Sequence, residues 1–220
     1  CLRDDLNQKA HRRMVVLNPL KLTITNYDQL ETLKAANHPK EEARGHRELP
    51  MSSTLWIDRD DFMEDPPKKY FRLKPGGEVR LRNSYIVKCE EVIKDDKGEV
   101  IELKATIDPN TLGKNPEGRK VKGIIHWVSA DKAVPVTVRL YDRLFNDANP
   151  GGHKEKSFIE FLNPNSLEVV KNCYAEPAIQ SAKPGESFQF ERVGYFCLDQ
   201  DSTDGDLIFN RSVSLRDNWK

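Results

Sequence analysis

The sequence has few cysteines, and they follow no pattern that carries chemistry. Only four of its 220 residues are cysteine, and no two of them form a CxxC pair. This spacing excludes a zinc knuckle and a dense disulfide framework. We therefore expect reduced thiols in a cytosolic protein, at Cys1, Cys89, Cys173 and Cys197.

The sequence also lacks any long apolar run. A helix that spans a bilayer needs roughly 20 predominantly apolar residues, and no segment approaches that length. The first residues, CLRDDL, include neither an initiator Met nor the apolar stretch of a signal peptide. We therefore expect no membrane-spanning helix, and we expect residue 1 to be an internal position of a longer protein.

An excess of charge of either sign is absent as well. Thirty-five basic and thirty-five acidic residues cancel, which argues against a protein coated by nucleic acid over its whole surface. The basic residues are nevertheless clustered, because residues 66–88 contain seven of them and a single acid, Glu78. A second basic patch follows at 114–122. Such clusters fit a phosphate-binding surface or a solvated strand face, and charge alone favours neither.

Short segments rich in Val, Ile, Phe, Tyr and Thr dominate the chain, and turn residues separate them. This pattern is typical of β-barrels and sandwiches, and 37% hydrophobic residues suffice for a globular core. We predict an all-β fold of two β-barrels, with few short helices at 2–10 and 27–34 and a turn near 129–133. The predicted strand segments are 14–25, 54–57, 78–94, 99–108, 121–129, 134–144, 157–162, 167–174, 187–198 and 207–215.

Two segments that begin alike suggest how these strands are divided into domains. Residues 17–22, LNPLKL, resemble residues 162–169, LNPNSLEV, and each opens an extended run. We expect them to start and finish one proximal barrel, formed by residues 1–65 and 164–220. The distal barrel, residues 66–163, is then inserted into it. Residues 1–10 are expected to be the tail of a preceding domain, and DDKG at 95–98 is expected to close a hairpin.

Several motifs follow one another along almost the whole chain. They are NHP at 37–39, WIDR at 56–59, VRLRN at 79–83, GRKVKGIIHWVS at 118–129, VRLYDRLF at 138–145, FQFER at 188–192 and GYFC at 194–197. Together they closely resemble the anticodon-binding region of glutaminyl-tRNA synthetases. Archaeal and eukaryotic-type glutamyl-tRNA synthetases share the architecture and are an alternative, as is an unrelated RNA-binding β-barrel protein.

The resemblance implies a class I enzyme that joins glutamine to its tRNA using ATP and Mg²⁺. Its partners would be tRNA-Gln and an upstream catalytic domain of the same chain. It would be a cytoplasmic monomer with no membrane partner. This chain contains no motif like HIGH or KMSKS. Met51-Ser52-Ser53 resembles part of KMSKS but lacks its lysines. We therefore expect no catalytic residue, metal site or cofactor in the chain itself.

The resemblance also implies which residues read the anticodon, CUG or UUG. Arg12, Gln189 and Arg192 fall where the family binds the central U, and Glu191 supports them. Arg72 falls where the final G is read. Bases of a single-stranded loop are accessible in this way because they can be unstacked and bonded on their otherwise paired edges.

Arg80 and Arg82 fall near the first, variable base and its phosphates. Lys69 and Phe71 depart from the bacterial relatives, which carry Gln and Lys at these two positions. Lys69 is retained as a candidate contact to the anticodon, and Phe71 is a candidate to stack on a base. A weaker, phosphate-binding role is expected for Lys68, Lys74, Lys88, Arg119, Lys120 and Lys122.

Strand alternation supports part of these assignments independently. Successive side chains of a strand point to opposite faces, so Arg80 and Arg82 share one face while apolar neighbours share the other. Gln189 likewise alternates with phenylalanines on both sides. Arg192 breaks this pattern, so a twist or bulge before Gly194 is needed to bring it to the RNA.

Structural roles compete with functional ones at several positions. Arg12 also suits the end of a helix, where cations favour the dipole. His126, in an apolar strand, is expected to be a hydrogen-bonded core residue rather than a catalytic one. The acids at 58, 60 and 61 fit a helix cap or turn better than a cation site. A small β-rich enzyme, a third class of function, explains neither the basic patch nor the motifs.

Overall fold

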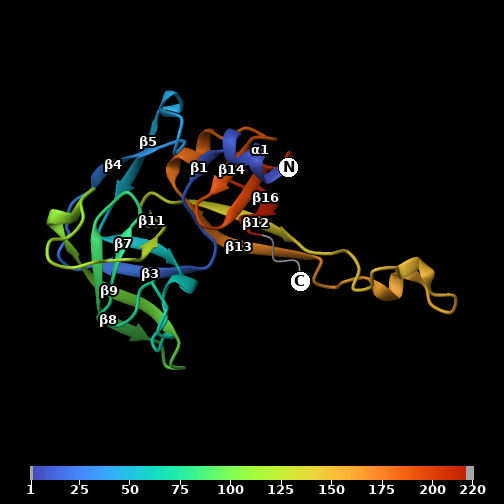
Figure 1. Ribbon diagram of the computed structural model, residues 1–220, viewed down its shortest axis with the longest axis horizontal. Coiled ribbons are helices and arrows are strands. Elements are labelled where there is room, and N and C mark those ends of the chain that lie inside the picture. The colour runs from blue at the N-terminus through green and yellow to red at the C-terminus, as the bar shows by residue number, and fades with distance from the viewer. Residues whose placement is uncertain (1, 217–220) are drawn as a thin grey trace.

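The computed structural model describes residues 2–216, and Cys1 and residues 217–220 lie outside the described part. Two barrel-shaped sheets lie beside each other, and α1 (Leu2–Lys9) packs against one of them (Figure 1). The predicted all-β fold of two barrels is thereby confirmed, as is the first predicted helix. Among the described residues, no helix has the length and apolarity needed to cross a membrane.

The proximal barrel contains both ends of the described chain. Its sheet has the order β1 (His11–Arg13), β14 (Ser187–Phe190), β15 (Gly194–Leu198), β16 (Leu207–Ser214), β12 (Val134–Tyr141), β13 (Leu167–Ala175) and β2 (Val15–Val16). Only Met14 separates β1 from β2, so the two edges of the sheet meet and the barrel closes. Its core is aromatic, because Phe188, Phe190, Phe196 and Phe209 are buried in it.

The distal barrel closes in the same way. Its sheet has the order β10 (Ile124–Ile125), β7 (Glu78–Leu81), β8 (Ile86–Lys94), β9 (Val100–Asp108), β3 (Pro19–Ile24), β6 (Thr54–Asp58) and β11 (Trp127–Ser129). Here His126 alone separates the two edge strands. The core forms because every second residue of β3 and β7 is apolar and buried, among them Leu20, Leu22, Val79 and Leu81.

The strand pairing places the domain boundaries elsewhere than predicted. All distal strands belong to one segment, 19–129, which lies between β2 and β12 in the chain. The segments that begin alike therefore open strands of different barrels, because β3 pairs with β9 while β13 pairs with β12. The predicted boundaries near residues 65 and 163 are wrong for this reason. A shared Leu-Asn-Pro start marks how a strand begins, and the partner strand is set by the tertiary fold.

Two other sequence predictions are wrong. Residues 27–34 form no helix; instead β4 (Glu31–Ala36) pairs with β5 (His46–Met51) in a separate two-stranded sheet. Burial of Leu33 and Ala35 against the distal core overrides the helix propensity of this segment. Residues 157–162 form a 3-10 helix, Phe158–Phe161, which begins with a capping box. The predicted hairpin at 95–98 is confirmed, since Asp95 N–H donates to Glu99 O at 2.9 Å.

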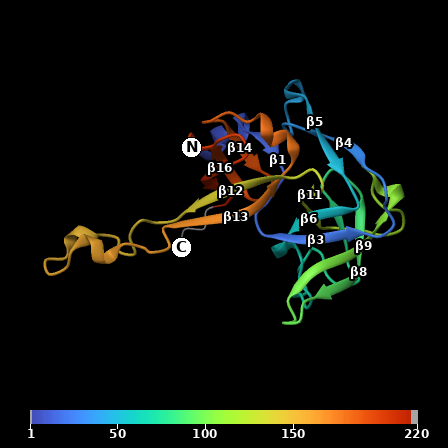
Figure 2. The same ribbon diagram turned by 180° about the vertical axis from the view of Figure 1, so that it is seen from behind.

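The connection between β12 and β13 is a long extension. Residues 142–166 project away from both barrels, as Figure 1 and, from behind, Figure 2 show in yellow and orange. Several of its large apolar side chains are exposed, including Leu144, Phe158 and Ile159.

Candidate nucleic-acid interface

Arg12 and Gln189 lie opposite each other on the parallel strands β1 and β14. The Arg12 guanidinium donates to Ala10 O at 2.7 Å and to Asn7 Oδ1 at 2.8 Å. The Gln189 amide donates to the Tyr195 hydroxyl at 2.8 Å, and that hydroxyl lies 3.1 Å from the same Asn7 oxygen. One hydrogen-bonded network therefore joins the two residues that were predicted to bind the same base.

Arg192 lies in the turn between β14 and β15 rather than in a strand. Its φ is +69°, the left-handed region, and Val193 N–H donates to Phe190 O at 2.9 Å across the turn. The departure from alternation that the sequence requires is thus a hairpin turn. The Arg192 guanidinium donates to both oxygens of Asp61, at 2.5 and 2.6 Å, and lies 3.0 Å from His126 Nδ1.

Arg72 reaches the same carboxylate from the distal side. Its Nε lies 3.3 Å from Asp61 Oδ1, and its NH1 donates to Asp60 O at 2.7 Å. Asp61 ends a short 3-10 helix whose first residue follows the cap Asp58, so the predicted cap or turn cluster is confirmed. A cleft of 430 Å³ between the barrels is lined by Leu17, Asp58, Arg72, His126, Glu168 and Arg192.

His126 is a core residue, as predicted. It lies between β10 and β11 and is 3% exposed. Burial lowers the pKa of its imidazole to about 4, although the nearby Asp61 carboxylate opposes the shift. The ring is therefore neutral near pH 7, and its Nδ1 accepts a hydrogen bond from Arg192.

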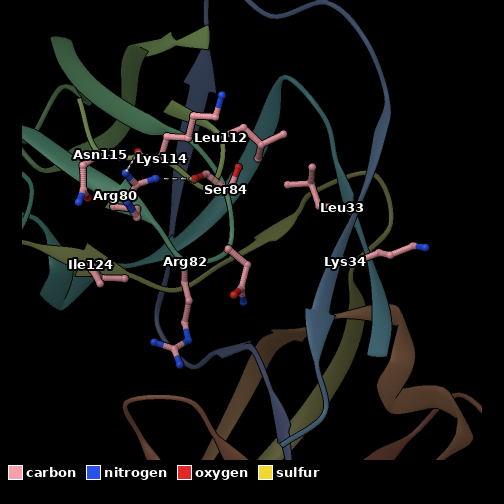
Figure 3. A pocket seen from close by; sticks show the side chains of 11 residues that line it. Leu33, Lys34, Arg80, Arg82, Ser84, Leu112, Lys114, Asn115 and Ile124 are labelled. Carbon is pink, nitrogen blue, oxygen red and sulfur yellow. Dashed lines mark hydrogen bonds between the residues drawn. The ribbon is translucent and has the colours of Figure 1, made fainter. Parts of the chain in front are cut away.

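Arg80 follows the predicted alternation, but its guanidinium is already bonded to backbone. It donates to Ser84 O at 2.9 Å and to Lys114 O (Figure 3), and also to Thr111 O at 2.8 Å. Arg80 therefore ties the loop after β9 to the end of β7. The pocket around it, 610 Å³ in volume, is also lined by Leu33, Lys34, Leu112, Asn115 and Ile124.

Arg82 is directed away from the Arg80 guanidinium in Figure 3. Its Nε forms an ion pair with Glu191 of the proximal barrel. Glu191 is buried and also accepts from Arg47 NH2 at 2.9 Å. Glu191 directly precedes Arg192, so adjacent residues of the chain form the ion pairs with Arg82 and with Asp61.

Arg47 and Glu176 complete this network, and neither was named in the sequence analysis. Arg47 Nε forms an ion pair with Glu176 Oε1, and Arg13 Nε lies 3.7 Å from the same oxygen. The other oxygen of Glu176 accepts from Met14 N–H at 2.9 Å. Burial raises the pKa of the Glu176 carboxyl, and the two arginines oppose that shift. The signal that sequence inspection missed is the charged Arg47 at a core-facing position of β5.

The predicted phosphate-binding residues divide into two groups. Within residues 2–216, Lys68, Lys74 and Lys120 form no ion pair or side-chain hydrogen bond and are exposed, as is Lys69, the predicted anticodon contact. The others are partly engaged. Lys88 Nζ lies 3.1 Å from Glu90, Arg119 pairs with Glu78 and Asp108, and Lys122 lies 5.1 Å from the centre of the Phe71 ring.

The thiols and carboxylates of the described part form no metal site. No group of three or more His, Cys, Asp or Glu side chains there has the arrangement needed to hold an ion. Cys89, Cys173 and Cys197 are free.

Comparisons with known proteins identify the family of the chain. Two family models with the same description, tRNA synthetases class I (E and Q), anti-codon binding domain, match residues 10–108 and 124–199. A glutamine–tRNA ligase of Pseudomonas syringae pv. tomato is 55% identical over 99% of this chain and 39% of its own length. Those of Azotobacter vinelandii and Neisseria gonorrhoeae are 53% and 51% identical, over 99% and 100% of this chain.

This chain thus spans about 40% of the length of the curated relatives it matches. The two family matches fall on both barrels and include all the arginines around Asp61, Glu176 and Glu191. The chain belongs to the anticodon-binding domain family of the class I tRNA synthetases for glutamate and glutamine.

Proposed function

We propose that this chain binds the anticodon loop of tRNA-Gln and reads CUG or UUG, as part of a glutamine–tRNA ligase. The observation that carries the proposal is that residues of both barrels meet: Arg192 and Arg72 contact Asp61 beside the cleft between the barrels, and Arg82 pairs with Glu191. Arg12 and Gln189 lie opposite each other on β1 and β14, and β14 leads directly into Glu191 and Arg192. Side-chain donors grouped in this way suit the edges of unstacked bases.

Each proposed role follows from the donors that a side chain presents. The Gln189 amide both donates and accepts, as a uracil edge requires. Arg72 bonds to protein through Nε and NH1, so other N–H groups of its guanidinium are left to meet the two acceptors of guanine. Arg80, bonded to three carbonyls, is proposed to shape the pocket for the first base, and Arg82 to contact that base or its phosphate.

Lys69, in the loop that also presents Arg72, is proposed to contact the anticodon. Lys68 and Lys74 of the same loop, and Lys120 of the second basic patch, are proposed to contact the RNA backbone. Exposed ammonium groups of this kind contribute sequence-independent affinity for phosphates. Phe71, exposed beside Lys122, is proposed to stack on a base.

The ligase reaction itself is proposed for the full-length protein. There, a catalytic domain upstream of this chain would attach glutamine to the tRNA in the cytoplasm, using ATP and Mg²⁺. This chain is proposed to supply recognition and no catalytic group, and the protein is proposed to be monomeric. Glutamine–tRNA ligases as relatives favour this assignment over a glutamyl-tRNA synthetase.

The first prediction concerns the isolated chain. It should bind tRNA-Gln more tightly than tRNA-Glu, whose anticodon ends in C rather than G, by about tenfold or more, because a paired base edge is lost. Fluorescence anisotropy with the two labelled tRNAs at one salt concentration measures the ratio. Preference for tRNA-Glu would favour the glutamyl-specific alternative, and equal binding of all tRNAs would favour an unrelated RNA-binding barrel.

The second prediction separates base reading from charge. Arg72→Lys should reduce discrimination of G from A at the final position by roughly 1–3 kcal/mol, because lysine lacks the planar fork. Lys74→Ala, the matched control in the same loop, should weaken binding of both loops alike and lower the slope of log affinity against log salt by about 0.7. Salt titrations with two anticodon stem-loops test both variants. An unchanged ratio in Arg72→Lys would place Arg72 in the general phosphate surface.

A further inference from the structure

Asp61 lies between two arginines that belong to different barrels. It follows β6 of the distal barrel and is 2% exposed. Arg192, in the β14–β15 turn of the proximal barrel, donates to both of its oxygens. Arg72, in the loop before β7, places Nε 3.3 Å from Oδ1. One buried carboxylate therefore contacts two guanidinium groups that are assigned to different bases.

These contacts fix the direction of the donors that remain. A guanidinium has five N–H donors in one rigid plane. Arg192 meets Asp61 through NH1 and NH2, and Arg72 meets it through Nε while NH1 donates to Asp60 O. Because the group is planar, bonding one edge to Asp61 determines where the other N–H groups point.

Among residues 2–216, no other carboxylate contacts both arginines. Asp58 accepts from Leu17 N–H and Asp60 N–H, both at 3.3 Å. The Asp60 side chain is exposed, and this residue meets Arg72 through its backbone oxygen. Without the Asp61 charge, the guanidinium groups of Arg72 and Arg192 would have no shared anion between them, and like charges repel.

We infer that Asp61 is a positioning residue that aligns Arg72 and Arg192 together and thereby couples the reading of the final and central anticodon bases. This inference rests on the proposed function. It adds that the two base pockets, built on separate barrels, share one carboxylate and do not act independently.

The test uses Asp61→Asn and four anticodon stem-loops that combine U or C at the centre with G or A at the end. Asparagine keeps the shape but loses the charge that both arginines contact. We expect both the U-to-C and the G-to-A affinity ratios to fall by about tenfold, since Arg192 loses charged hydrogen bonds and Arg72 loses its ion pair. Asp65→Asn removes an equal charge from an exposed position in the following loop and should leave both ratios unchanged.

The outcomes are distinguishable. Wild-type protein that prefers neither U nor G overturns the proposed function and this inference with it. A wild-type preference that Asp61→Asn retains at either position overturns the inference alone, and so does a uniform loss of affinity with both ratios intact. If Asp61→Asn fails to fold by circular dichroism, Arg192→Lys replaces it: the final-base ratio should fall although Arg192 is assigned to the central base, and an unchanged ratio overturns the coupling.

Discussion

Replacing Arg47 by alanine is expected to lower the free energy of unfolding by about 3–5 kcal/mol, because it removes one partner from a buried ion-pair network. Arg47 is 5% exposed and contacts both Glu176 and Glu191, which are 1% and 4% exposed. Without Arg47, the buried carboxylates of Glu176 and Glu191 each lose a cationic partner. Arg13 lies 3.7 Å from Glu176, which is too far to replace the close contact that Arg47 makes.

Urea unfolding followed by circular dichroism measures this change at neutral pH. The matched control is Lys104→Ala, which removes an exposed ion pair with Glu91 and should lower the free energy of unfolding far less, because exposed ion pairs contribute little. Equal effects of the two substitutions would show that the Arg47 network contributes no more to stability than a surface pair.

Acidification is expected to destabilise the protein through His126. Burial lowers the pKa of His126 from 6.5 to about 4 in the folded state. Below pH 6.5 the unfolded chain therefore binds a proton that the folded chain excludes, so the stability present above pH 6.5 is lost as the pH falls towards 4. At about 1.4 kcal/mol per pH unit, this loss amounts to roughly 3 kcal/mol.

Comparison of wild type with His126→Gln isolates the contribution of this imidazole. Glutamine does not titrate, so the wild type should lose stability relative to the variant by that amount between pH 7 and pH 4, as measured by urea unfolding. The control variant His46→Gln, changed at an exposed position, should show the same pH dependence of stability as the wild type. If the free energy of unfolding fell equally with pH in wild type and in His126→Gln, that result would contradict a lowered pKa of His126.

The strands could be predicted wherever one face of a strand is buried. In β7 the alternation of Glu78, Val79, Arg80 and Leu81 matches their alternating burial. The β4–β5 hairpin could not be predicted in the same way, because the sequence TLKAA contains good helix formers. Its strand conformation depends on pairing with β5 and on packing against the distal core, and both are tertiary effects.

The members of the candidate site could be named from the sequence, but their arrangement could not. A strand pattern relates residues a few positions apart, whereas Arg192 meets Asp61 across 131 positions and Arg47 meets Glu191 across 144. Asp61 was expected only to cap or turn the chain, since nothing nearby indicates its two cationic partners. Arg80 was expected to offer its guanidinium to RNA, and two of the three carbonyls that bind it, those of Thr111 and Lys114, come from a distant loop.

The insertion of one barrel into the other also sets the order in which the chain can fold during synthesis. β1 emerges early from the ribosome, but its partner β14 follows only after the complete distal barrel. The seven distal strands all lie within residues 19–129, so that barrel has every pairing partner while β1 and β2 still have none. Pairing of such distant strands is intrinsically slow, and unpaired edges are prone to association meanwhile. The distal barrel thus has the first opportunity to fold, and the proximal barrel closes last, when its C-terminal strands arrive.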